Sequence, residues 1–301
     1  MIRSVGTLYA IQDLFDHLEQ HLIAKDEFLA GFSKYGTSTA LDVYDTASEL
    51  SWICTADSGQ LVPTLIGKGA NQGINRPSKL RCQLAKIIEA NHPTWAALLP
   101  KGRKEAVAGF PEEIRQCFDE ALLLGEISED VVLWWAQSSS VMRAIAQRMR
   151  VATGVRGERK SLFYEYQRTG HTPRWQGFET SYAGYDVLSV RDNQHQEALK
   201  IEVKASDRNF RYAEIHLTEH EWITASKSVG SYLFHIWLFD EAQPRLFIVD
   251  SSTIIAHVPT NQGRGRWRDT IATRIADNSQ DRRPPGSART RRQPPPLPDL
   301  R

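Results

Sequence analysis

The sequence has 301 residues, of which 41% are hydrophobic and 24% are charged, and its net charge is +1. A chain of this length and composition can bury a hydrophobic core and typically forms about two globular domains. The near-zero net charge gives no global signal for a nucleic-acid partner, so any such signal must come from where the basic residues lie.

Apolar runs and cysteines bear on the compartment of the protein. No window approaches the roughly 18 consecutive apolar residues of a membrane span, and the first twenty residues lack the uninterrupted apolar core of a secretory signal. Cys54, Cys82 and Cys117 are odd in number and have no CxxC spacing, which argues against a disulfide framework and a zinc site. We therefore expect a cytoplasmic protein with no membrane partner.

Residues 1–72 have the pattern of a small helical unit that ends in a hairpin. Apolar residues recur at helical spacing near the N-terminus, and Thr39 can cap a later helix. Two short extended segments follow around the turn at residues 57–59. This order of helices and hairpin resembles a winged helix.

The third predicted helix of this region is poorly suited to DNA. It carries Asp42, Asp45 and Glu49 and no Lys or Arg, which sets like charge against the phosphates of a major groove. We favour a protein contact or dimerisation over direct DNA reading, although winged helices serve both uses.

The rest of the chain divides by composition. Residues 73–150 predict a helical connector. In residues 151–275 a helix, three strands, a helix with a capping box and further strands predict a mixed α/β domain around a central sheet. Residues 276–301 are rich in Pro and Arg and predict a disordered basic tail. The predicted fold class is mixed α+β, with an N-terminal helical region.

Charged residues interrupt two adjacent predicted strands, "GYDVLSV" and "LKIEVKAS". Because side chains alternate along a strand, Glu202 and Lys204 share one face, opposite their apolar neighbours. The polar stretch between the strands can form an antiparallel hairpin that brings Asp186 beside Glu202. Two carboxylates and an ammonium then converge, and a one-residue slip in register would separate them.

These three groups indicate a particular chemistry. Carboxylate oxygens suit a hard cation such as Mg²⁺, with Mn²⁺ as an alternative. A bound ion lowers the pKa of a coordinated water and offsets charge that builds up on a phosphate. A nearby ammonium can orient or help deprotonate the attacking water, or stabilise that charge. The set predicts metal-assisted phosphodiester hydrolysis.

The pattern also resembles the PD-(D/E)XK nuclease superfamily, which has an acid on its second strand and (D/E)-x-K on its third. More narrowly, "GE", "GYDVLS", "IEVKAS" and "LTEHEW" resemble the restriction-endonuclease-like domain at the C-terminus of No Vein-type proteins. This resemblance covers residues 154–250. It implies that Asp186 and Glu202 hold the metal ion, with the Val203 carbonyl as a further ligand, that Lys204 acts on the attacking water, and that Glu158 completes the metal site.

A second glutamate, Glu165, competes with Glu158 for the role on the first helix. It lies on the same helical face about 10 Å further along the axis, so both cannot bind one ion. We prefer Glu158 because of its "GE" context and interpret Glu165 as a solvated residue.

Basic residues flank the two strands and predict contacts with nucleic acid, with solvated surface charge as the competing interpretation. The predicted contact residues are Lys200, Arg156, Arg159, Lys160, Arg264, Arg266 and Arg268.

The combined hypothesis is a Mg²⁺-dependent DNA endonuclease, with RNA as a second candidate substrate. The resemblance implies a role in restriction or antiphage defence. A homodimer would supply one site for each strand of a duplex. A helicase or ATPase is a candidate partner, because the chain has no GxxxxGK[ST] phosphate loop. The alternative is a DNA-binding regulator or adaptor whose nuclease-like domain is catalytically silent.

Overall fold

The computed structural model describes residues 4–31, 38–208, 214–239, 243–254, 271–274 and 280–281. The chain divides into two compact units, residues 1–147 and 148–301. The 41-residue helix α8 (Glu129–Thr169) contributes to both units. It joins two segments that the sequence suggested as separate helices, because no residue between them stops the helix. Among the described residues, no helix is long and apolar enough to cross a membrane.

The first unit is mostly helical and has one hydrophobic core, which runs from Val5 to Ile145. Residues 1–72 and 73–150 therefore contribute to the same core. The predicted cap at Thr39 is present, since its side chain accepts a hydrogen bond from the backbone N–H of Asp42. The elements are α1 (Val5–Leu18), α2 (Lys25–Gly31), α3 (Ala40–Glu49), β1 (Ile53–Thr55), β2 (Leu61–Pro63), α4 (Leu65–Ala70), α5 (Arg76–Asn91), η1 (Thr94–Lys101), α6 (Arg103–Ala108) and α7 (Glu112–Glu120).

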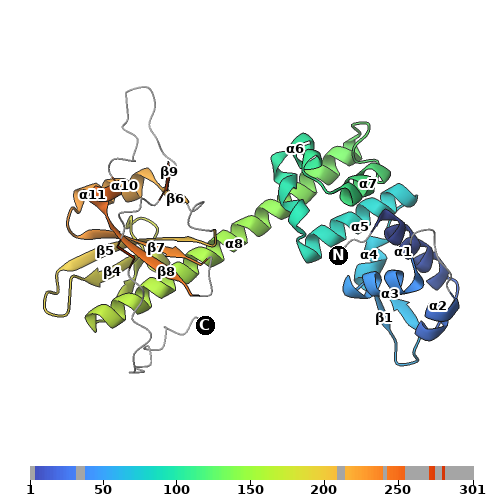
Figure 1. The fold of residues 1–301 in the computed structure, drawn as a ribbon, viewed down its shortest axis with the longest axis horizontal. Helices are drawn as coiled ribbons and strands as arrows, with labels where there is room; N and C mark the ends of the chain where they lie inside the picture. Colours follow the sequence, from blue (N-terminus) through green and yellow to red (C-terminus); the bar gives the residue numbers. More distant parts are fainter. Residues whose placement is uncertain are drawn as a thin grey trace. The chain divides into compact units, whose positions relative to one another are not determined.

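The order of three helices and a hairpin expected for residues 1–72 is observed in α1, α2, α3, β1 and β2 (Figure 1). The hairpin is antiparallel, with Cys54 opposite Val62. Gly59 has a φ of 79° in the turn, a conformation that glycine adopts without steric cost. Whether this unit acts as a winged helix stays a prediction.

The second unit is built on a six-stranded mixed sheet with the order β10-β8-β7-β5-β4-β3. Its strands β5 and β7 are parallel because the chain crosses over through a helix, α10 (Glu219–Lys227), and the other pairs are antiparallel. The strands are β3 (Arg174–Trp175), β4 (Val187–Val190), β5 (Ala198–Ser206), β7 (Tyr232–Leu238), β8 (Arg245–Asp250) and β10 (Gln280–Asp281). A second, two-stranded sheet pairs β6 (Glu214–Leu217) with β9 (Ile271–Arg274).

Both faces of the larger sheet are covered by helices (Figure 1). The end of α8 packs on one face, where Tyr164 joins a cluster with Ile201 and Trp237. The other face packs against α10 and the short helix α11 (Ser251–Ile254), with Phe234 and Ala225 in a second cluster. Because both faces of the sheet are covered by helices, β7 has apolar side chains on both of its sides. The mixed α+β fold class is thus confirmed.

Two segments differ from their expected form. The first of the three strands predicted for this domain is only two residues long, β3. The short helix α9 (Gln176–Glu179) follows it directly. The predicted tail, residues 276–301, lies outside the described residues except for β10, which pairs with β8.

Candidate active site

Asp186 lies just before β4 and faces β5. Val187 is paired with Ile201, so one step outward Asp186 comes opposite Glu202. The N–H of Asp186 donates to the Ile201 carbonyl at 2.9 Å, and the N–H of Val203 donates to Asp186 Oδ2 at 2.8 Å. The Asp186 carboxylate therefore takes the place of a backbone carbonyl as the hydrogen-bond acceptor of the Val203 N–H, just beyond the end of β4. Opposed residues share a face, so the predicted hairpin brings Asp186 and Glu202 together.

Lys204 connects two carboxylates from different elements. Its Nζ lies 2.7 Å from Glu202 Oε1 on the same strand and 2.8 Å from Glu221 Oε2 on α10. Glu221 is also the third residue of α10 and forms a capping box with Thr218. Its Oε2 accepts the backbone N–H of Thr218 at 3.0 Å. Glu202 is only 3% exposed. The ion pairs therefore hold β5 and α10 together inside the domain.

A glycine brings helix α8 close enough for Glu158 to reach these groups. A Cβ added at Gly157 would lie 2.8 Å from Ala205 Cβ, which is closer than such atoms pack. The absence of a side chain at Gly157 therefore allows α8 to contact β5 directly. The next residue, Glu158, extends toward the end of β4.

The carboxylates of Glu158 and Asp186 meet at Gly177. A Cβ added at Gly177 would lie 2.9 Å from Asp186 Oδ1 and 3.2 Å from Glu158 Oε2. The same Glu158 oxygen accepts a hydrogen bond from the indole N–H of Trp175. Because Gly177 has no side chain, the two carboxylates can converge over this position of α9 without being displaced.

Glu158, Asp186, Glu202 and Glu221 with Lys204 form what we call the carboxylate site, and its acidic groups outnumber its basic one. Burial raises the pKa of Asp186 to about 6, and the charge of Glu158 adds to the effect. Burial likewise raises the pKa of Glu158 and raises that of Glu202 well above its usual range. For Lys204, burial opposes the charged form, but the carboxylates of Glu202 and Glu221 outweigh it and raise its pKa. One ammonium therefore faces four acidic groups.

The donor set suits a hard cation better than a soft one. Within the described residues, no group of three or more His, Cys, Asp or Glu side chains is arranged to hold a metal ion. Mg²⁺ commonly takes only one or two protein carboxylates and keeps several waters. The oxygens of Asp186 and Glu202 fit that mode. Their pKa values are raised mainly by burial, which disfavours the ionised carboxylates, and a bound cation would stabilise that ionised form.

Glu165 is not the solvated residue that its sequence context suggested. It is 1% exposed and accepts hydrogen bonds from Arg168 and Ser189. Its Oε1 also lies 3.7 Å from Nε2 of the buried His235. Glu165 is thus engaged in a separate buried cluster, and the role of Glu158 in the site stays a prediction.

The predicted nucleic-acid contacts are distributed over the second unit. Lys200 donates to Ser228 Oγ at 2.9 Å and lies over the Tyr185 ring. Arg156 lies over the Phe239 ring, and both Arg159 and Lys160 are exposed on α8. The three arginines at positions 264, 266 and 268 lie outside the described residues.

Two residues of the site were missed from the sequence. The capping box identified Glu221 only as the start of a helix, although that box was the available signal. The buried Tyr232 donates its hydroxyl to the Gly184 carbonyl at 2.7 Å, and after burial the Glu202 charge is the largest factor that raises its pKa. Its position depends on the parallel pairing of β5 with β7, for which the sequence offered no local signal.

Residues 157–249 match the family model described as the C-terminal domain of protein NO VEIN. The match begins at the glycine where α8 meets β5 and contains every residue of the carboxylate site. No match was found among the curated proteins or among the solved structures.

Proposed function

We propose that the second unit is a metal-dependent endonuclease that hydrolyses phosphodiester bonds in DNA. The observation that carries this proposal is the convergence of Asp186, Glu202 and Glu158 around the ammonium of Lys204. The match to the NO VEIN C-terminal domain supports a nuclease-like character for the same residues. A role in restriction or antiphage defence follows from the resemblance alone, and a cytoplasmic location follows only from the sequence pattern.

Asp186 and Glu202 are the residues that would hold the ion. The Val203 carbonyl is a further candidate, since the N–H and C=O of a strand residue point to the same side and its N–H is directed at Asp186. When bound, Mg²⁺ would supply Lewis-acid stabilisation of the phosphate and a more acidic water.

The protein's own groups divide the remaining tasks. Lys204 is held in its charged form by two carboxylates, so it serves better as a stabiliser of negative charge on the phosphate than as a base. A carboxyl group with a pKa of about 6, such as Asp186, is mostly ionised at neutral pH yet takes up a proton more readily than an ordinary aspartate, so it is suited to binding or orienting the attacking water. The Glu158 carboxylate lies beside that of Asp186 at Gly177 and would orient the same water.

The test is cleavage of supercoiled plasmid, linear duplex DNA and RNA by the purified protein with Mg²⁺, with Mn²⁺ or with EDTA. We expect DNA cleavage that EDTA abolishes. Lys204→Ala and Asp186→Ala should each lower the rate by at least about a hundredfold, as is typical when a charge-stabilising group or a key acid is removed.

Matched controls come from the same elements. Asp192→Asn changes an acid in the β4–β5 turn whose carboxylate accepts hydrogen bonds from Gln194 and His195 of the same turn. Lys227→Ala changes an exposed lysine at the end of α10. Both should cut like the wild type. If folded wild type binds DNA but cuts no substrate under any of these conditions, the silent-regulator alternative replaces the proposal.

A further inference from the structure

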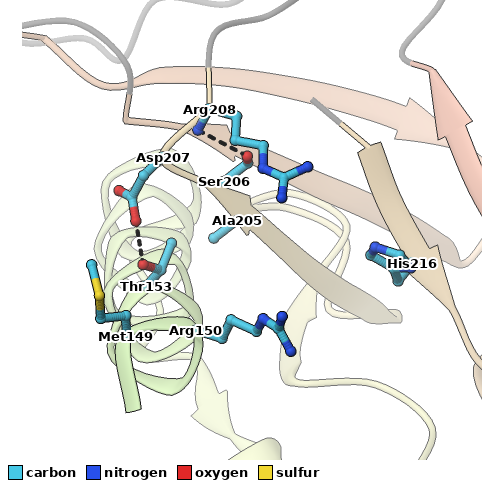
Figure 2. Close-up of a pocket in the computed structure, with 8 residues that line it drawn as sticks. All are labelled: Met149, Arg150, Thr153, Ala205, Ser206, Asp207, Arg208 and His216. Atoms are coloured by element: carbon cyan, nitrogen blue, oxygen red, sulfur yellow. Dashed lines mark hydrogen bonds between the residues drawn. The ribbon is translucent and has the colours of Figure 1, made fainter. Parts of the chain in front are cut away.

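A basic pocket lies beyond the C-terminal end of β5. Its cavity volume is about 630 Å³, within the usual range for ligand sites. Helix α8, the end of β5 and strand β6 all contribute to its wall (Figure 2). The lining residues are Met149, Arg150, Thr153, Ala205, Ser206, Asp207, Arg208 and His216.

Three basic side chains from three segments converge on this pocket. Figure 2 shows Arg150, Arg208 and His216 directed into the same space. In the described part of the chain, neither arginine forms an ion pair. Unpaired guanidinium groups facing one cavity give it a positive potential and indicate an anionic ligand.

The one acidic residue of the pocket is already engaged. Asp207 accepts a hydrogen bond from the Thr153 hydroxyl, and its other oxygen lies 3.8 Å from Arg156. Ser206 Oγ accepts the backbone N–H of Arg208 at 3.1 Å, so its own proton can be donated to a ligand. The pocket thus offers donors to an anion.

We propose that the basic pocket binds a backbone phosphate of the nucleic-acid strand that the carboxylate site cuts. This inference rests on the proposed function. Arginine side chains match phosphate oxygens in a two-point geometry. Ser206 follows Lys204 by two residues on β5, which is about 7 Å along a strand and corresponds to roughly two nucleotides of rise along DNA.

The consequence is a fixed path for the strand. A phosphate held by Arg150 and Arg208 would place another phosphate, roughly two nucleotides away, near Lys204. The pocket would then position the substrate without touching the bond that breaks. It differs from the predicted contacts at Lys200, Arg159 and Lys160, which do not line it.

The experiment measures binding of fluorescein-labelled single-stranded and duplex DNA 20-mers by anisotropy, in EDTA so that no cleavage occurs. Arg150→Ala and Arg208→Ala should each weaken binding roughly tenfold, the usual effect of losing a charge-assisted hydrogen bond. Each should also reduce the slope of log K against log salt by about 1. Arg148→Ala removes the same charge from an exposed position two residues away on α8 and should change neither quantity. Equal melting temperatures identify the folded variants.

Cleavage assays with Mg²⁺ then separate the two proposals. If the wild type cuts DNA and both pocket variants bind and cut like it, the pocket inference is wrong and the proposed function stands. If no protein cuts but the pocket variants bind DNA more weakly, the pocket does bind a backbone phosphate of DNA, and the proposed function and the cleaved strand are overturned. If the wild type binds a nucleoside monophosphate or inorganic phosphate but not the 20-mers, the pocket is a small-anion site and the strand proposal is overturned.

Discussion

Lys204 on β5 and Glu221 on α10 form an ion pair of 2.8 Å across the domain. Glu221 also caps its own helix through Thr218. The start of α10 and the charge state of the lysine therefore depend on the same carboxylate. This coupling links local helix stability to the carboxylate site.

Substitution of Glu221 separates those two roles. Glu221→Gln keeps an oxygen that can accept the Thr218 N–H, but it removes one of the two charges that hold Lys204. We expect a drop in cleavage rate with a small loss of stability. Glu221→Ala should cost about 1 kcal/mol more in unfolding free energy, because the cap is lost as well.

Urea unfolding and initial cleavage rates of the two variants measure these effects. Glu219→Gln is the matched control, since Glu219 is a first-turn acid of the same helix that does not pair with Lys204. Equal stability of Glu221→Gln and Glu221→Ala would contradict a capping role.

Asp186→Asn is expected to stabilise the protein while it abolishes activity. In metal-free protein, burial raises the pKa of Asp186 from the ordinary 3.8 to about 6. Its buried charge therefore lowers the free energy of unfolding most strongly above pH 6, where the folded protein carries that charge. At pH 8 the variant should gain about 1–3 kcal/mol. Because folding favours the protonated acid, this gain should shrink as the pH falls through 6 and vanish below about pH 4.

Denaturant unfolding of wild type and variant at pH 8 and pH 4.5, in EDTA, measures the gain. Asp192→Asn should behave in the opposite way, because hydrogen bonds from His195 and Gln194 lower the pKa of Asp192 to about 2. A loss of stability in Asp186→Asn at pH 8 would show that its charge is already compensated in the fold.

The parts of the carboxylate site that are local in sequence were predictable. Alternation along β5 sets Glu202 and Lys204 on one face, and a short hairpin fixes Asp186 opposite Glu202. Glu158 was accessible only through family resemblance, since nothing in helical periodicity reports that Gly157 packs against Ala205.

The remaining features depend on contacts between distant segments. The Lys204–Glu221 pair requires the parallel pairing of β5 with β7 and the packing of α10 against the sheet. The helix itself was predicted from its capping box, but neither this strand pairing nor this packing has a local signal. The burial of Glu165 requires Arg168 and Ser189 to satisfy it together. Charged residues on a helix are usually exposed, so the sequence favoured the wrong environment for Glu165.

His235 should make stability fall in mild acid. This fully buried imidazole has a pKa lowered by burial to about 4, and Ser161 Oγ lies 3.2 Å from its Nδ1. The unfolded chain binds a proton near pH 6.5, so the contribution of neutral His235 is complete above that value and is lost as the pH falls toward 4. We expect it to account for about 2 kcal/mol between pH 7 and pH 5.

The comparison is the change in unfolding free energy from pH 7 to pH 5, in EDTA, for wild type and His235→Asn. Asparagine keeps a polar group near Ser161 but does not titrate in this range. The variant should be less stable at pH 7 and less sensitive to acid. The protonation of Asp186 acts with the opposite sign and is common to both proteins, so it cancels in the difference. Equal pH sensitivity would exclude His235 as the titrating group.

Gly157 and Gly154 form a matched pair for testing the contact between α8 and β5. A Cβ at Gly157 would lie 2.8 Å from Ala205 Cβ, whereas a Cβ at Gly154 would meet nothing within 4 Å. Gly157→Ala should therefore cost about 1–3 kcal/mol through overpacking, even though alanine is the better helix former. Gly154→Ala should add about 0.5–1 kcal/mol through helix propensity. Because Glu158 follows Gly157, the displaced helix should also lower cleavage in Gly157→Ala and leave Gly154→Ala fully active. Thermal unfolding and cleavage rates of the two variants measure both effects, and a stabilising Gly157→Ala would mean that α8 does not pack closely on β5.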